Sequence, residues 1–178
     1  PFSSAQEMYD SQKGPYKLPP QGDVSVLTRP VQGRGFTLKN AMVIQPMEGC
    51  DADHTGAPTD WTKRRYCRFA AGGAGLIWME AVAVTPEARA NPCQLMITED
   101  NIESFRQLLA DTRRAAADAG LEAPKIIAQL THSGRWSRPV DAKTPIRNWY
   151  NETLDRHQNL PEDYPIISNE ELEKLPAK

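Results

Sequence analysis

The sequence is poor in cysteine and lacks any cysteine pattern that a cross-linked or metal-bound domain would need. Cys50, Cys67 and Cys93 are odd in number, widely spaced and form no Cys-x-x-Cys pair. A disulfide framework and a zinc or iron–sulfur cradle are therefore excluded, and reduced thiols in packing roles are expected. We predict no metal site.

Long hydrophobic runs and a strong excess of one charge are also absent. No 18 consecutive apolar residues occur, and the N-terminus has no basic segment followed by an apolar one, so neither a transmembrane helix nor a secretory signal is indicated. The formal net charge of −2 offers no general attraction to nucleic acid or to an anionic membrane. We expect a cytoplasmic protein whose partners are small molecules or proteins, not nucleic acid or membrane.

Proline, in contrast, is abundant and unevenly placed. The chain of 178 residues has 15 prolines, ten of them in residues 1–30 and 131–178. This distribution predicts an extended N-terminal arm over residues 1–25 and a folded region from residue 26 to residue 178. The length lies below the roughly 250 residues of a complete (β/α)8 barrel.

The first elements after the arm are predicted from short apolar runs and turn residues. Residues 26–31 and 36–38 are typical of two strands of a hairpin around the glycines of 32–35. Residues 41–45 form a continuous apolar run ended by Pro46, as in a buried parallel strand. A helix is expected to begin at Thr59 or Asp60 and to end at the glycine pair 72–73.

The strand–loop–helix unit then recurs. Residues 75–79 predict a second buried strand, residues 102–119 an amphipathic helix closed by Gly120, and residues 125–130 a third strand. A loop of roughly 35 residues follows, and Ser168 begins a further helix. Alternating elements indicate a parallel α/β sheet. Because three strands leave two bare edges, we expect a further part of the fold to complete the sheet.

Chemistry in such folds gathers at the carboxyl ends of the strands. Four motifs lie at or near these positions, in order and in register: Asn40-x-x-Val-Ile leading to Pro46-Met47, Gly72-Gly73-Ala74-Gly75-Leu76-Ile77 leading to Glu80-Ala81, Arg89, and Gln129-Leu130-x-His132-x-Gly134-Arg135. Together they resemble the old yellow enzyme family of NAD(P)H:flavin oxidoreductases. The resemblance extends over about residues 26–175.

This resemblance implies an α/β fold of the (β/α)8 TIM barrel type that holds FMN at its mouth and takes NAD(P)H as reductant. Residues 26–178 would be its N-terminal part, a hairpin and about the first three β/α units, incomplete at the C-terminus. By position, the backbone of Pro46 and Met47 would face the flavin, Glu48 would lie near its O4 and N5 edge, and Ala81 would pack on the ring system. Gln129 would reach the pyrimidine ring, whose adjacent carbonyl and N–H match the donor and acceptor of a carboxamide. Plain packing for Met47 and Ala81, and backbone capping by Gln129, are the alternatives.

Glu48 and Cys50 differ from the residues that many relatives carry at these positions. Most relatives carry Thr or Cys at the position of Glu48. An ionised carboxylate there would disfavour the electron-rich reduced flavin, whereas a protonated one would donate a hydrogen bond to it. Alternatively, the side chain turns away and binds a neighbouring backbone group. Cys50 stands where some relatives place a substrate-facing Tyr, and its alternative is a packed loop residue. A structural role is expected for His132 before an acid–base one, and loop anchoring for Arg135 before flavin or phosphate contact.

In the family, the His/Asn or His/His pair that binds the substrate carbonyl, the Tyr that donates a proton and the loops that bind the FMN phosphate follow these motifs in the sequence. No catalytic residue is therefore assigned. The implied function is FMN-dependent reduction of activated, enone-like alkenes by hydride transfer through flavin N5. The alternative is a non-catalytic half-barrel that requires a complementary chain. A following iron–sulfur and nucleotide-binding module, the substrate's identity and homo-oligomer formation stay open.

Overall fold

The computed structural model describes residues 2–15 and 25–175, which group into two units, residues 1–41 and 42–178. The first unit contains two short helices, α1 (Ala5–Ser11) and α2 (Ser25–Thr28), and two strands, β1 (Val31–Gly33) and β2 (Phe36–Leu38). The expectation of a wholly extended arm is wrong at α1, where the Ser4 hydroxyl caps the helix by accepting a hydrogen bond from the Glu7 amide at 3.1 Å. Residues 16–24 of the predicted arm lie outside the described residues.

The predicted hairpin is present but shorter than expected. β1 and β2 pair antiparallel, with Val31 opposite Leu38 and Gly33 opposite Phe36. Residues 26–28, predicted as strand, form α2 instead, and the Thr28 hydroxyl donates to the Ser25 carbonyl at 3.0 Å. A local side-chain bond of this kind favours a turn of helix over a strand. The domain division at residues 25 and 26 remains a prediction.

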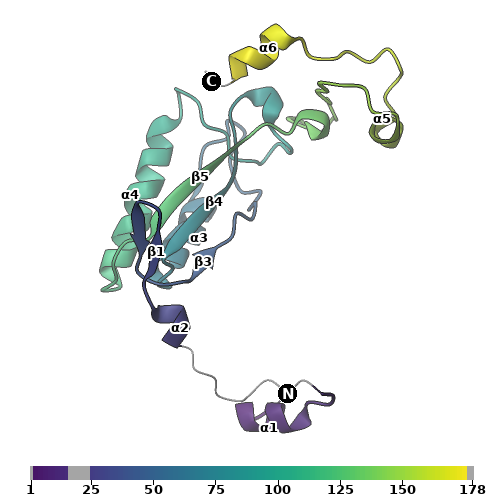
Figure 1. The fold of residues 1–178 in the computed structure, drawn as a ribbon. Coiled ribbons are helices and arrows are strands. Elements are labelled where there is room, and N and C mark those ends of the chain that lie inside the picture. Colours follow the sequence, from purple (N-terminus) through teal and green to yellow (C-terminus); the bar gives the residue numbers. More distant parts are fainter. Residues whose placement is uncertain (1, 16–24, 176–178) are drawn as a thin grey trace. The chain divides into compact units, whose positions relative to one another are not determined.

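The second unit confirms the repeated strand–helix order. Its elements are β3 (Val43–Ile44), α3 (Asp60–Ala71), β4 (Leu76–Ala83), α4 (Ile102–Asp118) and β5 (Lys125–Thr131). The strands form one parallel sheet in the order β3-β4-β5, and Figure 1 shows the two long helices beside it. β3 is only two residues long, whereas β4 runs four residues past the predicted end at residue 79.

The hydrophobic core lies between β4 and the two long helices. Tyr66 of α3 and Phe105 of α4 pack with Ile77 and Val82 of β4, and all four are nearly inaccessible to solvent. On the opposite face of the sheet, Trp78 is paired with Ile127, and these side chains are 41% and 44% exposed. One face of the described sheet is therefore covered by helices and the other carries exposed apolar side chains.

The helix ends follow the predicted signals. Thr59 is the N-cap of α3, and Gly120 follows the C-cap of α4 with φ +70°, a conformation that favours glycine. Ser168 caps α6 (Asn169–Lys174) and exchanges hydrogen bonds with Glu171. The long loop after β5 contains two helices that the sequence did not predict, the short 3-10 helix η2 (Gly134–Trp136) and α5 (Glu152–Gln158).

Candidate functional site

The register of the sheet brings two of the predicted site residues together. Ile44 pairs with Ile77, and Ile77 pairs with Ile126. Further along these strands, Ala81 of β4 is the direct partner of Gln129 of β5. Met47 lies in the loop after β3, where its amide donates to the carbonyl of Gln45 at 2.9 Å.

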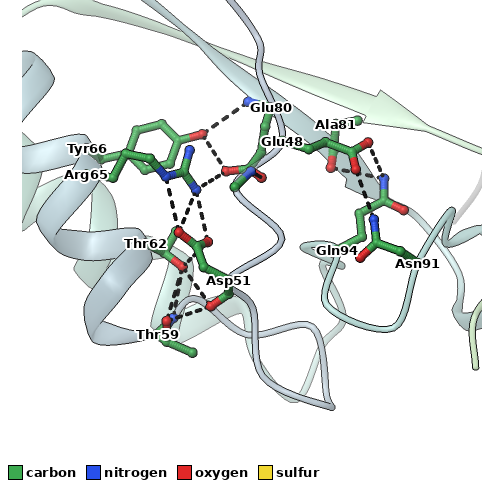
Figure 2. A network of polar contacts seen from close by, with 11 residues as sticks. Glu48, Asp51, Thr59, Thr62, Arg65, Tyr66, Glu80, Ala81, Asn91 and Gln94 are labelled. Carbon is green, nitrogen blue, oxygen red and sulfur yellow. Dashed lines mark hydrogen bonds and ion pairs between the residues drawn. The ribbon is translucent and has the colours of Figure 1, made fainter.

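A β-bulge in β4 shapes the carboxyl edge of the sheet. The register shifts between Trp78 and Ala81, so β4 holds one residue more than β5 over that stretch. The extra residue breaks the alternation of side chains, and Met79 and Glu80 are both buried. Glu80 is only 1% exposed and is directed at the loop that follows β3 (Figure 2).

The Glu80 carboxylate holds that loop through its main chain. Its Oε2 accepts a hydrogen bond from the amide of Gly49 at 2.8 Å, and its Oε1 accepts from the Arg65 guanidinium at 2.5 Å and from the Tyr66 hydroxyl at 3.2 Å. Arg65 also binds both carboxylate oxygens of Asp51, at 2.9 and 3.0 Å. Figure 2 shows this cluster joining α3, β4 and the loop.

Glycine at position 49 lets the loop come close to the same cluster. A Cβ atom there would lie 2.2 Å from Nη2 of Arg65, closer than any real contact allows. A side chain at this residue would therefore force the Arg65 guanidinium to move away from its partners Asp51 and Glu80.

Burial and charge shift the titration of the groups in the cluster. The pKa of Tyr66 is raised because its hydroxyl is buried and faces the charge of Glu80. Burial opposes the charge of Arg65, but its bonds to Asp51 and Glu80 prevail and raise its pKa. Tyr66 thus stays neutral and Arg65 stays charged.

Glu48 lies on the other side of the loop and turns to a second loop, residues 90–94. Its Oε2 accepts from Nδ2 of Asn91 at 3.0 Å, and its Oε1 accepts from Nε2 of Gln94 at 3.5 Å. The carboxylate therefore meets side-chain amides, where the sequence analysis had considered a backbone group. Partial desolvation and the negative charge of Glu80 raise the pKa of Glu48, while the Asn91 bond lowers it in part.

The remaining loop residues are accessible. Pro46 is half-buried, and the Met47 side chain is 76% exposed, so this stretch of main chain is open to a ligand. Cys50 is exposed and adopts φ +48°. Desolvation, with the neighbouring charge of Glu48, raises the pKa of its thiol, so Cys50 is predominantly a neutral thiol near pH 7.

Gln129 has a polar atom that the described residues leave unsatisfied. Its Oε1 is buried and has no hydrogen-bond partner among residues 2–15 and 25–175. An unpaired buried amide oxygen is costly, so this atom can gain a hydrogen bond by accepting from a ligand. The N–H beside a carbonyl on the pyrimidine ring of a flavin fits this carboxamide, so the residues present are compatible with FMN.

His132 and Arg135 have structural partners. Nδ1 of His132 accepts the amide of Gly134 at 2.9 Å. Arg135 is 8% exposed, donates to the carbonyl of Trp149 at 2.8 Å and forms a buried ion pair with Asp155. Asp155 also pairs with Arg147 at 2.6 Å. These contacts support the loop-anchoring role expected for Arg135.

Arg89, part of the recognised motif, ties the two loops of the site together. Its guanidinium donates to the carbonyls of His54 at 3.0 Å and of Gln94 at 2.8 Å. The sequence alone did not predict that Gln94 and Asn91 bind Glu48, or that Arg65 binds Asp51 and Glu80. The only signal for the cluster was Glu80 itself, a carboxylate within an otherwise apolar strand.

Two kinds of site are absent from the part of the chain that the structure describes. No group of three or more His, Cys, Asp or Glu side chains there could hold a metal ion. None of the helices within residues 2–15 and 25–175 is both long enough and apolar enough to cross a membrane.

Comparison with known proteins agrees with the geometry. The chain is 35% identical over 133 residues to an NADPH dehydrogenase of Geobacillus thermodenitrificans. The matched stretch covers 72% of this chain and 37% of that protein. The chain is also 33% identical over 116 residues to an NADPH dehydrogenase of a Geobacillus species, covering 64% and 32%. The chain thus spans about a third of the length of the curated relatives it matches.

Solved structures show the same fold. An old yellow enzyme homologue from Zymomonas mobilis superposes with a TM-score of 0.57 and 28% identity, covering 70% of this chain and 33% of that one. Morphinone reductase superposes with a TM-score of 0.53 and 26% identity, covering 68% of this chain and 31% of that one. The described α/β units are therefore part of a TIM barrel of this type. A family model described as NADH:flavin oxidoreductase / NADH oxidase family matches residues 27–164, and the chain belongs to that family.

Proposed function

We propose that this chain builds one wall of the FMN site of an NAD(P)H oxidoreductase that reduces activated, α,β-unsaturated alkenes. The observation that carries the proposal is the unpaired, buried Oε1 of Gln129, a residue that is the direct partner of Ala81 in the sheet. Bound FMN would supply hydride transfer through its N5. The chain's own residues bind and orient the ring.

Each residue of the wall has a separate task. The Gln129 carboxamide would accept from the N–H of the pyrimidine ring and donate to the adjacent carbonyl. Ala81 offers a small apolar surface on which a flat ring can pack, and the main chain of Pro46 and Met47 offers polar groups at its edge. Cys50, exposed beside this loop, would meet the substrate. The protein would contribute to such a reaction by holding the reacting carbon in a fixed orientation and by stabilising the developing enolate.

The relatives support the choice of NAD(P)H as reductant. The curated matches are named NADPH dehydrogenases, and morphinone reductase, 26% identical to this chain, has a structure in complex with tetrahydroNAD. Because the chain covers about a third of these proteins, the carbonyl-gripping and proton-donating groups are to be sought in the remainder of the barrel.

A second candidate, a half-barrel that acts only with a complementary segment, is favoured by the open face of the sheet. Trp78 and Ile127 expose large apolar surfaces opposite the helices. In a closed barrel, such side chains are covered by the other strands. The rest of the barrel would come from the same chain or from a companion chain, and pairing of two copies is a further arrangement of the same kind.

One experiment tests the proposal. The polypeptide, purified as expressed from its native gene, is mixed anaerobically with FMN, NADPH and 2-cyclohexen-1-one. The proposal predicts yellow protein and alkene-dependent consumption of NADPH. Colourless protein after gel filtration, or a rate of NADPH consumption that does not depend on the alkene, would refute it. Native mass spectrometry of the yellow fraction shows whether a second polypeptide accompanies the chain.

A further inference from the structure

The side chain of Gln94 is buried between the two loops that form the flavin-facing edge. It is 1% exposed, and its carboxamide is fully used. Oε1 accepts from the amide of Ala90 at 2.5 Å, while Nε2 donates to the carbonyl of Ala81 at 3.2 Å and to the Glu48 carboxylate at 3.5 Å. One amide thus contacts both loops and the strand between them (Figure 2).

Gln94 stands where the sheet lacks a strand. β3 ends at Ile44, and Pro46 has no amide hydrogen to continue the ladder along β4. Further along that edge, the segment after Gln94 takes over, since the Ala83 amide donates to the carbonyl of Leu95 at 2.8 Å and the Ile97 amide donates to that of Ala83 at 3.1 Å. The Gln94 side chain occupies the gap between β3 and this segment.

Asn91 supports the same arrangement from the surface. Its Oδ1 accepts from the amide of Cys93 at 2.9 Å, and its Nδ2 donates to Glu48 at 3.0 Å. Two amides that are themselves fixed by main chain therefore hold one carboxylate. Bonds from neutral donors to an ionised acceptor are among the stronger hydrogen bonds in proteins.

We infer that Gln94, assisted by Asn91, is a positioning residue of the flavin site: by joining Glu48 to the Ala81 carbonyl, it fixes the spacing between the main chain of Met47 and the surface of Ala81. The inference rests on the proposed function. It assigns to Glu48 the role of a link between loops.

The test uses a charge exchange across this contact. Gln94→Glu places two carboxylates together and turns an acceptor toward the Ala81 carbonyl, so FMN affinity falls by about tenfold, the equivalent of one good hydrogen bond. Adding Glu48→Gln to the same chain removes the repulsion between residues 48 and 94 and recovers part of the loss. Gln32→Glu, on the exposed strand β1, is the matched control and leaves FMN affinity unchanged, because the side chain at this position only accepts a hydrogen bond from the Thr37 hydroxyl at 2.8 Å and a carboxylate can still do so.

Three measurements read the outcome: the FMN dissociation constant, the induced circular dichroism of the bound flavin, and the urea midpoint of the flavin-free protein. The inference predicts loss of affinity and an altered flavin spectrum in Gln94→Glu, with partial recovery of both in the double variant. A double variant no better than Gln94→Glu, or a Gln94→Glu protein that binds FMN as the wild type does, overturns the inference. Wild-type protein that binds no FMN overturns the proposed function as well, so the two failures are distinct.

Discussion

Glu80 is expected to be the most sensitive position of the loop-holding cluster. Glu80→Gln keeps the size of the side chain but removes its charge, so Arg65 loses a partner at 2.5 Å and the Gly49 amide faces an NH2 group or a weaker acceptor. Breaking one partner of a buried ion pair costs about 3–5 kcal/mol. Because Arg65 retains Asp51, we expect the lower end, about 3 kcal/mol.

Equilibrium unfolding in urea measures this loss. With an m-value of about 2 kcal/mol per molar, a loss of 3 kcal/mol lowers the midpoint by about 1.5 M. Glu103→Gln is the control, since its pair with Arg106 spans 3.6 Å between side chains that are 79% and 68% exposed. Such a surface pair contributes at most about 0.5 kcal/mol. If both variants shift the midpoint equally, the buried cluster does not stabilise the fold as argued.

Three further changes test neighbouring parts of the account. Gly49→Ala forces a Cβ against the Arg65 guanidinium and should lower FMN affinity by about tenfold in a binding titration, and unchanged affinity would exclude the tight approach. The pKa of Glu48 is raised above its usual 4.5, so protonation of this carboxyl stabilises the fold fully below pH 4.5, and this stabilisation is lost as the pH rises through the raised pKa. Glu48→Gln should therefore flatten the pH dependence of the free energy of unfolding measured in urea. An unaltered pH dependence would contradict the assignment. Asp155→Asn leaves the buried guanidinium groups of Arg135 and Arg147 without their carboxylate and should lower the free energy of unfolding by about 3–5 kcal/mol, measured by thermal unfolding. A loss of under about 1 kcal/mol would show instead that the cluster is solvated.

The repeated fold was predictable because its signals are local. The continuous apolar runs of β4 and β5, the stripe of α4 and the glycine that ends it depend only on neighbouring residues. Gln129 and Ala81 could be placed at one edge because parallel strands end together. The paired register of these two residues agrees with that placement.

The parts that the sequence missed depend on long-range contacts. The bulge that turns Glu80 toward the loop exists only when β4 pairs with β5, and Gln94 finds Glu48 across 46 positions of chain. Residues 26–28 were assigned to a strand from a short apolar run beside a glycine turn, but they form α2, in which the Thr28 hydroxyl donates to the Ser25 carbonyl. No periodicity in one segment encodes such contacts.

The most direct test of the central claim is the FMN dissociation constant of the Gln129→Leu variant beside that of the wild type. Leucine fills similar space but offers no donor or acceptor to the pyrimidine ring. The account predicts affinity about tenfold or more weaker for the variant, with no loss of stability, because the Oε1 that is removed has no partner among the described residues. Equal dissociation constants for the two proteins would show that Gln129 does not face the flavin.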